Sequence, residues 1–300
     1  MKLWNDTVSG FHARLVEVRS KPTADSYVAA VRLWEQFLSE NRIELSTAHP
    51  GLLDDFVRWL VRRGSAPQTV VSRCTGVKSW LNHLKRLGYS VPDLLAPDLP
   101  KVATKDPVVL SLDQLASYFE RVNELHEPVR TAMTIMPLCG LRSDEVVRLT
   151  LSQLKVVDGW IIFTFSGKGG KIRSVPLLKQ GNAILRQYLT GWRAQFKSRY
   201  KNDAMFPGYH GGKPLATRTI RKWVEDVSRQ LDLPDLSPHV LRKTYTTMLD
   251  SMGVSPLMIA QLVGHFDLRT TSKHYIKHDM ESLVSSLARV HVPGVLVPTS

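Results

Sequence analysis

Apolar residues in the first part of the chain recur at the spacing of an α-helix. Three segments, residues 23–41, 50–64 and 66–89, each place them along one side of a helix. The residues are Tyr27, Val31, Trp34 and Leu38 in the first segment, Leu53, Phe56, Val57 and Leu60 in the second, and Val70, Val77, Trp80, Leu81 and Leu84 in the third. This pattern predicts a helical bundle over residues 1–94.

A proline-rich stretch ends the helical pattern. Pro92, Pro97, Pro100 and Pro107 exclude a continuous helix, and no alternation typical of a strand replaces it. We therefore expect a linker over residues 95–107 that joins the bundle to a second domain.

The second domain, residues 108–300, mixes helices with one β-hairpin. Residues 160–166 and 171–175 flank a glycine pair, which is the pattern of a hairpin turn. Helices are expected to start after Ser111 and to cover residues 181–199, 217–231 and 279–291. The chain is therefore predicted to be mainly α, with a helical bundle followed by an α+β domain that holds a small antiparallel sheet.

Charge is the first indication of a partner, because 40 Lys and Arg against 27 Asp and Glu give a net charge of +13. This excess favours a polyanion such as DNA, although a basic protein without such a partner has the same composition. Long apolar stretches and a secretory signal are both missing from the sequence, so we expect a cytoplasmic protein, associated with the nucleoid if DNA is the partner. Cys74 and Cys139 match neither zinc nor disulfide spacing and are expected to be reduced, buried thiols.

Cations occupy the polar side of the third helical segment and the linker. Arg73 and Lys78 lie on the helix, and Lys101 lies in the linker. We expect these side chains to contact DNA phosphates if the bundle grips a duplex; a solvated helix surface is the alternative.

Arg142 directly precedes a predicted helix for which Ser143 is a suitable N-cap. A guanidinium and the unpaired N–H groups of a helix end both attract an anion, and Glu145 is placed to hold the arginine. The alternative is an ordinary surface arginine before a helix.

Ser237 and Pro238 predict the start of another helix, in which His239 and Arg242 lie three residues apart on one face. A proton donor and a cation projected together suit a phosphate whose charge grows during reaction. A capping histidine beside a surface arginine is the alternative interpretation.

The segment near the C-terminus concentrates histidines around one tyrosine. A helix ending at Gly264 is followed directly by His265, and a second short helix carries Tyr275, which in isolation is typical of a packing residue. His274 and His278 have the i, i+4 spacing of a zinc pair, but the H-E-x-x-H arrangement does not accompany them.

Lys168 and Lys171 flank the expected hairpin turn and should therefore project to the same side. Either lysine is able to reach DNA as a mobile cation on a rigid base. The spacing alone does not favour one over the other.

The order of these motifs resembles the catalytic domain of the tyrosine recombinases, the phage-integrase family that includes Xer-type recombinases. The matching segments are GLRSDEVVRL, GKGGKIRSVPL, HVLRKTYTTML and LVGHFDLRTTSKHY. Single motifs of this kind are weak, whereas the set in register is highly specific. The N-terminal helices are similar to the family's core-binding domain, so the resemblance covers nearly the whole chain.

The resemblance implies site-specific DNA recombination by strand cleavage and rejoining, without a metal or nucleotide cofactor. It implies that Tyr275 is the nucleophile that forms a 3′-phosphotyrosyl bond, and that Arg142 and Arg242 bind the phosphate. It implies Lys168 as the general acid, because this lysine occupies the family's position in the hairpin.

Three further roles follow from the same resemblance. His239 and His265 are implied to hydrogen-bond the phosphate or assist proton transfer, and Glu145 to position the first arginine. Lys171 and Lys243 are expected to contact DNA; Lys243 stands where many members carry a histidine.

The resemblance also implies an assembly on double-stranded DNA. We expect two protomers on an inverted-repeat core site, a homotetramer on paired sites, and no arm-binding domain. The apolar stripe of residues 279–291 predicts a helix that docks on a neighbouring subunit, with docking on its own domain as the alternative. The other functional hypotheses are a type IB topoisomerase and a DNA-binding protein without catalytic activity.

Overall fold

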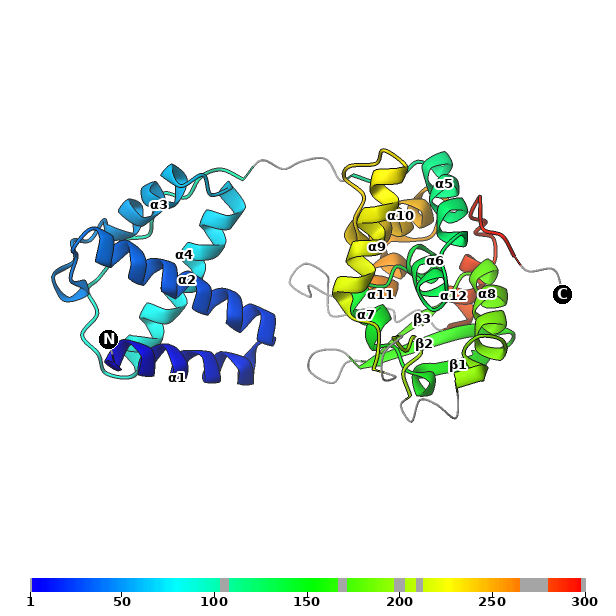
Figure 1. Cartoon of the computed structure of the whole chain (residues 1–300), viewed down its shortest axis with the longest axis horizontal. Coiled ribbons are helices and arrows are strands. Elements are labelled where there is room, and N and C mark those ends of the chain that lie inside the picture. Colours follow the sequence, from blue (N-terminus) through cyan, green and yellow to red (C-terminus); the bar gives the residue numbers. More distant parts are fainter. Residues whose placement is uncertain are drawn as a thin grey trace. The chain divides into compact units, whose positions relative to one another are not determined.

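The chain divides into two compact units, Met1–Lys105 and Asp106–Ser300 (Figure 1). The computed structural model describes residues 2–102, 108–166, 172–196, 203–208, 213–264 and 280–297. Within these ranges, none of the helices is both long and apolar enough to cross a membrane.

Unit 1 is a helical bundle built on the predicted stripes. Its α-helices are α1 (Lys2–Val18), α2 (Lys21–Glu40), α3 (Leu52–Arg62) and α4 (Pro67–Arg86). The stripe residues of α2, α3 and α4 are buried, except that Tyr27 is half-buried. Helices α2 and α4 meet at Gly76, where an added Cβ would lie 2.8 Å from the Cβ of Ala30. The prediction of a helical bundle is confirmed.

The start of the proline-rich stretch is packed on unit 1. The backbone N–H of Leu95 donates to the carbonyl of Pro50 at 2.8 Å, and that of Asp98 donates to the Asp54 carboxylate at 2.7 Å. Residues 95–98 are thereby held against the start of α3.

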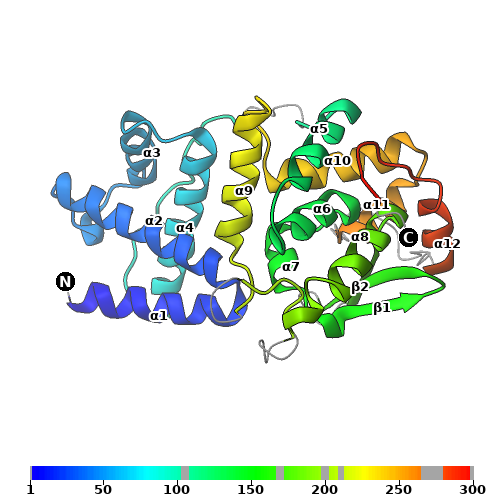
Figure 2. The same ribbon diagram turned by 45° about the vertical axis from the view of Figure 1, so that its right-hand side comes forward.

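Unit 2 is an α+β domain whose central helix is α6. Its helices are α5 (Leu112–Asn123), α6 (Val129–Cys139), α7 (Ser143–Arg148), α8 (Lys179–Thr190), α9 (Thr217–Gln230), α10 (Pro238–Ser251), α11 (Pro256–Val263) and α12 (Met280–Leu287). Helix α6 contacts α5, α7, α8, α9 and α10, and Figure 2 shows it in the middle of this unit. Ser111, Ser237 and Ser255 cap α5, α10 and α11 with their side chains.

The sheet of unit 2 is antiparallel with the order β1-β2-β3, and consists of β1 (Leu154–Val157), β2 (Trp160–Ser166) and β3 (Ile172–Pro176). Phe163 on β2 pairs with Leu154 on one side and Val175 on the other. Strands β2 and β3 confirm the predicted hairpin, but Ser166 pairs with Ile172, whereas a two-residue turn at Gly169 and Gly170 would pair it with Arg173. Strand β1 was not predicted, because its apolar residues Val156 and Val157 are exposed and so do not alternate with polar positions.

The lengths of two predicted helices are wrong. Helix α8 ends at Thr190 instead of continuing to residue 199, because Gly191 leaves the helical conformation; a short 3-10 turn, Ala194–Phe196, follows it. The terminal helix α12 covers Met280–Leu287, not residues 279–291.

The apolar side of α12 packs against the core of unit 2. Leu283 and Leu287 are buried in the core of this unit, and Val290 and Val292 continue the contact beyond the helix. The Gln180 side chain donates to the carbonyl of Val292 at 2.8 Å and accepts from its N–H at 2.7 Å. This packing within one unit differs from the predicted docking on a neighbouring subunit.

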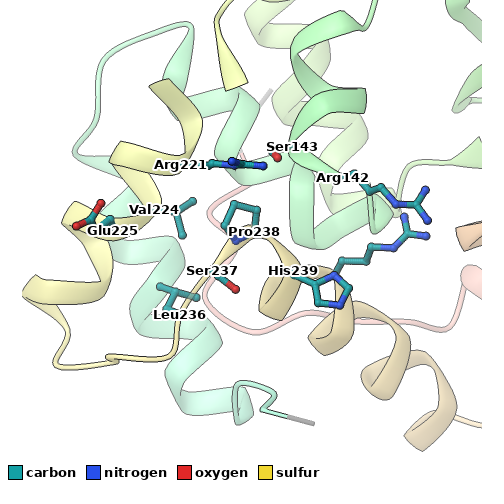
Figure 3. A pocket seen from close by; sticks show the side chains of 10 residues that line it. Arg142, Ser143, Arg221, Val224, Glu225, Leu236, Ser237, Pro238 and His239 are labelled. Carbon is teal, nitrogen blue, oxygen red and sulfur yellow. The ribbon is translucent and has the colours of Figure 1, made fainter. Parts of the chain in front are cut away.

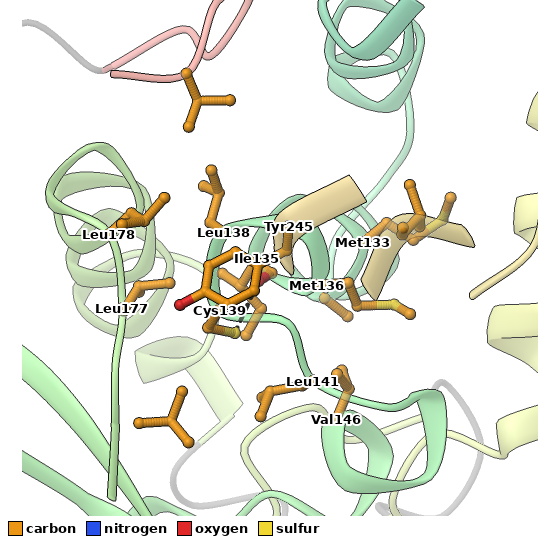
Figure 4. Close-up of a cluster of buried hydrophobic side chains, with 14 of the residues drawn as sticks. Met133, Ile135, Met136, Leu138, Cys139, Leu141, Val146, Leu177, Leu178 and Tyr245 are labelled. Carbon is orange, nitrogen blue, oxygen red and sulfur yellow. Dashed lines mark hydrogen bonds between the residues drawn. The ribbon is translucent and has the colours of Figure 1, made fainter. Parts of the chain in front are cut away.

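Tyr245 is at the centre of the core around α6 (Figure 4). Its ring lies against Gly140, which adopts a left-handed conformation with φ of +60°; an added Cβ would lie 2.4 Å from the Tyr245 Cδ1. Cys139 lies beside it, and both Cys74 and Cys139 are free and buried, which confirms the expectation of reduced thiols. The core therefore requires glycine at position 140.

We expect Gly140→Ala to lower the free energy of unfolding by about 2–5 kcal/mol, because it adds left-handed strain of about 1–2 kcal/mol to a steric clash worth about 1–3 kcal/mol. Gly159→Ala is the matched control, since Gly159 also has a positive φ, +82°, but has no atom within 4 Å of the added Cβ. Urea unfolding of the full chain measures the free energy of unfolding of both variants. Equal losses in the two variants would show that the contact with Tyr245 has no energetic weight.

Candidate active site

The site is built around the carboxylate of Glu145 on α7. Glu145 Oε2 accepts from the backbone N–H of Arg142 at 2.8 Å, and Oε1 accepts from Arg142 Nη1 at 3.0 Å. Arg142 itself occupies the N-cap position and Ser143 is the first helical residue, so the prediction of Ser143 as N-cap is wrong. Glu145, three residues into the helix, takes over the capping because it reaches back to the Arg142 N–H.

Two further guanidinium groups face the same carboxylate. Arg173 on β3 places Nη2 at 3.1 Å from Glu145 Oε2, and Arg242 on α10 places Nη1 at 3.7 Å from the same oxygen. Burial of Glu145 raises its pKa, but Arg173, the backbone N–H of Arg142 and the Arg142 charge outweigh this and leave the pKa below its usual value. The carboxylate is therefore ionised at neutral pH.

Arg242 is buried, with 3% of its side chain exposed. Its Nη1 donates to the carbonyl of Gly140 at 2.6 Å, and its Nη2 donates to the carbonyl of Val263 at the end of α11. Burial and the neighbouring Arg142 lower the pKa of Arg242 to about 10, so the group still carries its charge at neutral pH. Contacts to the C-terminal ends of α6 and α11 and to one carboxylate fix its orientation.

Arg142 and Arg242 line a common cavity of about 480 Å³. Its other lining residues are Ser143, Arg221, Val224, Glu225, Leu236, Ser237, Pro238 and His239. Figure 3 shows Arg142 and His239 at one end of the cavity and Glu225 at the other. The N-terminus of α10 opens into it and contributes a partial positive charge, so the cavity suits an anion.

His239 is exposed on the first turn of α10. Partial desolvation, followed by the cations Lys243, Arg242 and Arg142, lowers its pKa below the usual value. The imidazole is therefore mostly neutral at pH 7, and one ring nitrogen is available to accept a proton. The predicted grouping of His239 with Arg242 at one site is what the structure shows.

Sequence reasoning missed Arg173 and Arg221. Arg221 lies on the exposed face of α9 and lines the cavity with Ser143. Arg173 pairs with Phe165 across the sheet and shares a face with buried Val175. A charged residue on the buried face of a strand is the signal that was available, because such a group needs a partner.

Several of the predicted site residues are not among those that the structure describes. Lys168, Lys171, His265 and Tyr275, and with them His274 and His278 of the zinc alternative, lie outside the described residues. Among the described residues, no group of three His, Cys, Asp or Glu side chains is placed to hold a metal ion.

The expected DNA contacts differ in exposure. Arg73 is half-buried and donates to the carbonyl of Ser26 at 3.2 Å. Lys78 is half-buried and lines a cavity of about 330 Å³ at α3 and α4, whereas Lys101 is exposed. Lys243 is half-buried on α10, one helical turn from His239.

The family model described as "Phage integrase family" matches residues 109–282. The tyrosine recombinase XerD of Pseudomonas putida is 28% identical over 273 residues, which cover 88% of this chain and 90% of that protein. XerD of Listeria innocua is 27% identical and covers 89% of this chain and 92% of its own length.

Two solved structures share the fold. The XerH site-specific recombinase bound to difH, a pre-cleavage complex, has a TM-score of 0.69 at 18% identity and covers 86% of this chain and 80% of its own. A lambda integrase tetramer bound to a Holliday junction has a TM-score of 0.63 at 15% identity and covers 91% and 80%.

These comparisons agree with the motif order and do not favour a topoisomerase or a DNA-binding protein without activity. The family model covers more than half of the chain, and the site built on Glu145 lies within it. The chain therefore belongs to the phage integrase family and is a tyrosine recombinase of the Xer type, an enzyme of site-specific DNA recombination.

Proposed function

We propose that this recombinase cleaves one DNA strand at a time with Tyr275 and rejoins it to a new partner through a 3′-phosphotyrosyl intermediate. The observation that carries the proposal is the pair Arg142 and Arg242, which one ionised carboxylate holds at the wall of a common cavity. A guanidinium binds phosphate oxygens in a forked geometry, so two of them neutralise a phosphodiester from two directions.

The proposed cleavage step needs no reagent other than the DNA and the side chains of the enzyme. The Tyr275 hydroxyl gives its proton to a histidine as its oxygen forms a bond to phosphorus. The bond from phosphorus to the 5′-oxygen breaks, and the 5′-oxygen leaves as a hydroxyl after taking a proton from Lys168. The ester bond moves to the tyrosine, so its energy is kept for rejoining. Arg142 and Arg242 stabilise the charge that builds on the pentacoordinate phosphorus, a function that metal ions perform in other enzymes. We therefore propose catalysis without a metal or nucleotide cofactor.

The histidines assist proton transfer in this proposal. His239 lies beside the arginines at the cavity wall, and its lowered pKa favours the neutral form. One ring nitrogen of this form accepts the tyrosine proton, and the N–H of the other donates a hydrogen bond to a phosphate oxygen. His265 follows Gly264 at the end of α11 and is proposed to act beside it. Glu145 supports both arginines instead of the first alone.

The proposed substrate is duplex DNA with an inverted-repeat core site, bound by two protomers, with two sites paired in a tetramer. The lambda integrase structure, a tetramer on a Holliday junction, supports this assembly by fold similarity. Lys78, Lys101, Lys171, Lys243 and Arg73 are proposed to contact the backbone, and the protein is proposed to act in the cytoplasm at the nucleoid.

Tyr275→Phe should bind a nicked core site like the wild-type protein and yet form no SDS-resistant adduct, because only the hydroxyl is removed. Tyr245→Phe is the matched control. Tyr245 is fully buried, its hydroxyl has no hydrogen-bond partner among the described residues, and burial raises its pKa. It should form the adduct at the normal rate. An adduct from Tyr275→Phe would contradict the assignment of the nucleophile.

Lys168→Ala should slow cleavage of ordinary DNA by about 10²–10⁴-fold, the usual contribution of a general acid. On DNA with a 5′-bridging phosphorothiolate, the thiolate leaves without a proton, so the variant should cleave close to the wild-type rate. Lys171→Ala, tested in parallel, should show no selective rescue by the phosphorothiolate, because this lysine is proposed to contact the DNA backbone and not to protonate the leaving oxygen. The reverse pattern would assign the general acid to Lys171.

A further inference from the structure

We propose that Arg173 is a positioning residue of the active site: it holds Glu145 between the two phosphate-binding arginines and fixes the end of α11. The inference rests on the proposed function and adds a residue to it. Arg173 belongs to none of the expected catalytic positions, and it does not line the cavity formed by Arg142 and His239. Its effect on the reaction must therefore pass through other residues.

The guanidinium of Arg173 is bound on three sides. Its Nη2 pairs with Glu145 Oε2 at 3.1 Å, its Nη1 donates to the carbonyl of Val263 at 3.2 Å, and its centre lies 5.1 Å from the Phe165 ring centroid. Only 13% of its side chain is exposed. Burying a guanidinium is costly unless it is paired, so these contacts determine where the group lies.

Arg173 and Arg242 interact with the same two oxygen atoms. Both approach Glu145 Oε2, and both donate to the carbonyl of Val263. The negative end of α11 therefore lies against two cations, a favourable arrangement for a helix C-terminus. Removal of Arg173 would leave Arg242 as the one remaining guanidinium among the described residues that joins Glu145 to this carbonyl.

Gly264 shows how closely Arg173 is fitted to the end of α11. Gly264 is left-handed, with φ of +68°, and an added Cβ would lie 2.7 Å from Arg173 Nη1. The guanidinium thus occupies the space that a side chain at position 264 would need. Strand β3, which carries the catalytic hairpin, is thereby joined to the residue that precedes His265.

Because Arg173 is charged, its removal should change how the cleavage rate depends on pH. The groups that face Glu145 are Arg142 at its own helix start, Arg173 from β3, Arg242 from α10 and the buried thiol of Cys139 from α6. Arg173 is the strongest of the cations that lower the pKa of Glu145. Without it that pKa rises, so the carboxylate becomes protonated at a higher pH, and the acid limb of the cleavage rate should move to higher pH.

The test compares full-length Arg173→Met, Arg173→Lys and the wild type on a nicked core site, with Arg148→Met as the matched control. Arg148 is also on α7 but its side chain is 76% exposed. Arg173→Met should cleave about 10–100-fold more slowly, a loss typical of misplaced groups, with its acid limb at higher pH. Arg173→Lys should keep the acid limb near the wild-type position but remain slow, because one ammonium does not span both acceptors. Arg148→Met should match the wild type.

Three results would overturn the inference: a wild-type rate in either Arg173 variant, an acid limb that does not move in Arg173→Met, or full rescue on the 5′-phosphorothiolate substrate. Rescue would assign the effect to the hairpin lysine instead of Glu145. If Arg173→Met does not fold, the rate of Arg173→Lys and its response to the phosphorothiolate decide. The proposed function fails separately, if the wild-type protein forms no adduct or Tyr275→Phe does.

Discussion

The catalytic unit depends on one half-buried carboxylate, Glu145, that faces three guanidinium groups. A carboxylate without a cationic partner in this position would be costly, and the largely buried Arg173 and Arg242 need its charge in turn. The arginines come from the start of α7, from β3 and from α10, segments far apart in the sequence. A single charge thereby determines how three elements meet at the site.

The hydrophobic core and the active site share their boundary. The Gly140 carbonyl accepts from Arg242, while the α-carbon of the same residue lies against the Tyr245 ring. The conformation that allows the close packing also aims the carbonyl at the guanidinium. Tyr245 is thereby a core residue, and its buried hydroxyl is unsuited to attack a phosphate.

The sequence predicted those parts that depend on local patterns. Apolar spacing located the helices of the bundle, Ser111 and Ser237 marked helix starts, and the glycine pair located the hairpin. Strand β1 was missed because its side chains are mostly exposed and carry no alternation. For the terminal helix α12, the sequence left a neighbouring subunit and its own domain as possible partners, and the structure buries Leu283 and Leu287 in its own unit. An apolar stripe shows that a helix is covered, but it does not identify the covering surface.

Local sequence patterns also predicted only part of the active site. The motif order brought Arg142, His239 and Arg242 together, and the structure places all three around one cavity. Arg173 was not found, because its importance comes from contacts with Glu145 and Val263, which lie 28 and 90 positions away. Such contacts arise from the tertiary fold and leave no local pattern apart from a charge on a buried strand face.

The measurement that tests the central claim most directly is the cleavage rate of Glu145→Gln beside Glu225→Gln. Glutamine keeps the size of the side chain and removes the charge, and Glu225 lines the same cavity at its other end. Loss of the shared charge should lower the rate by about 10²–10³-fold, as for other preorganised electrostatic groups, while DNA affinity stays close to normal. Glu225→Gln should keep the wild-type rate. A wild-type rate in Glu145→Gln would show that the arginines reach the phosphate without the carboxylate, and would contradict the account.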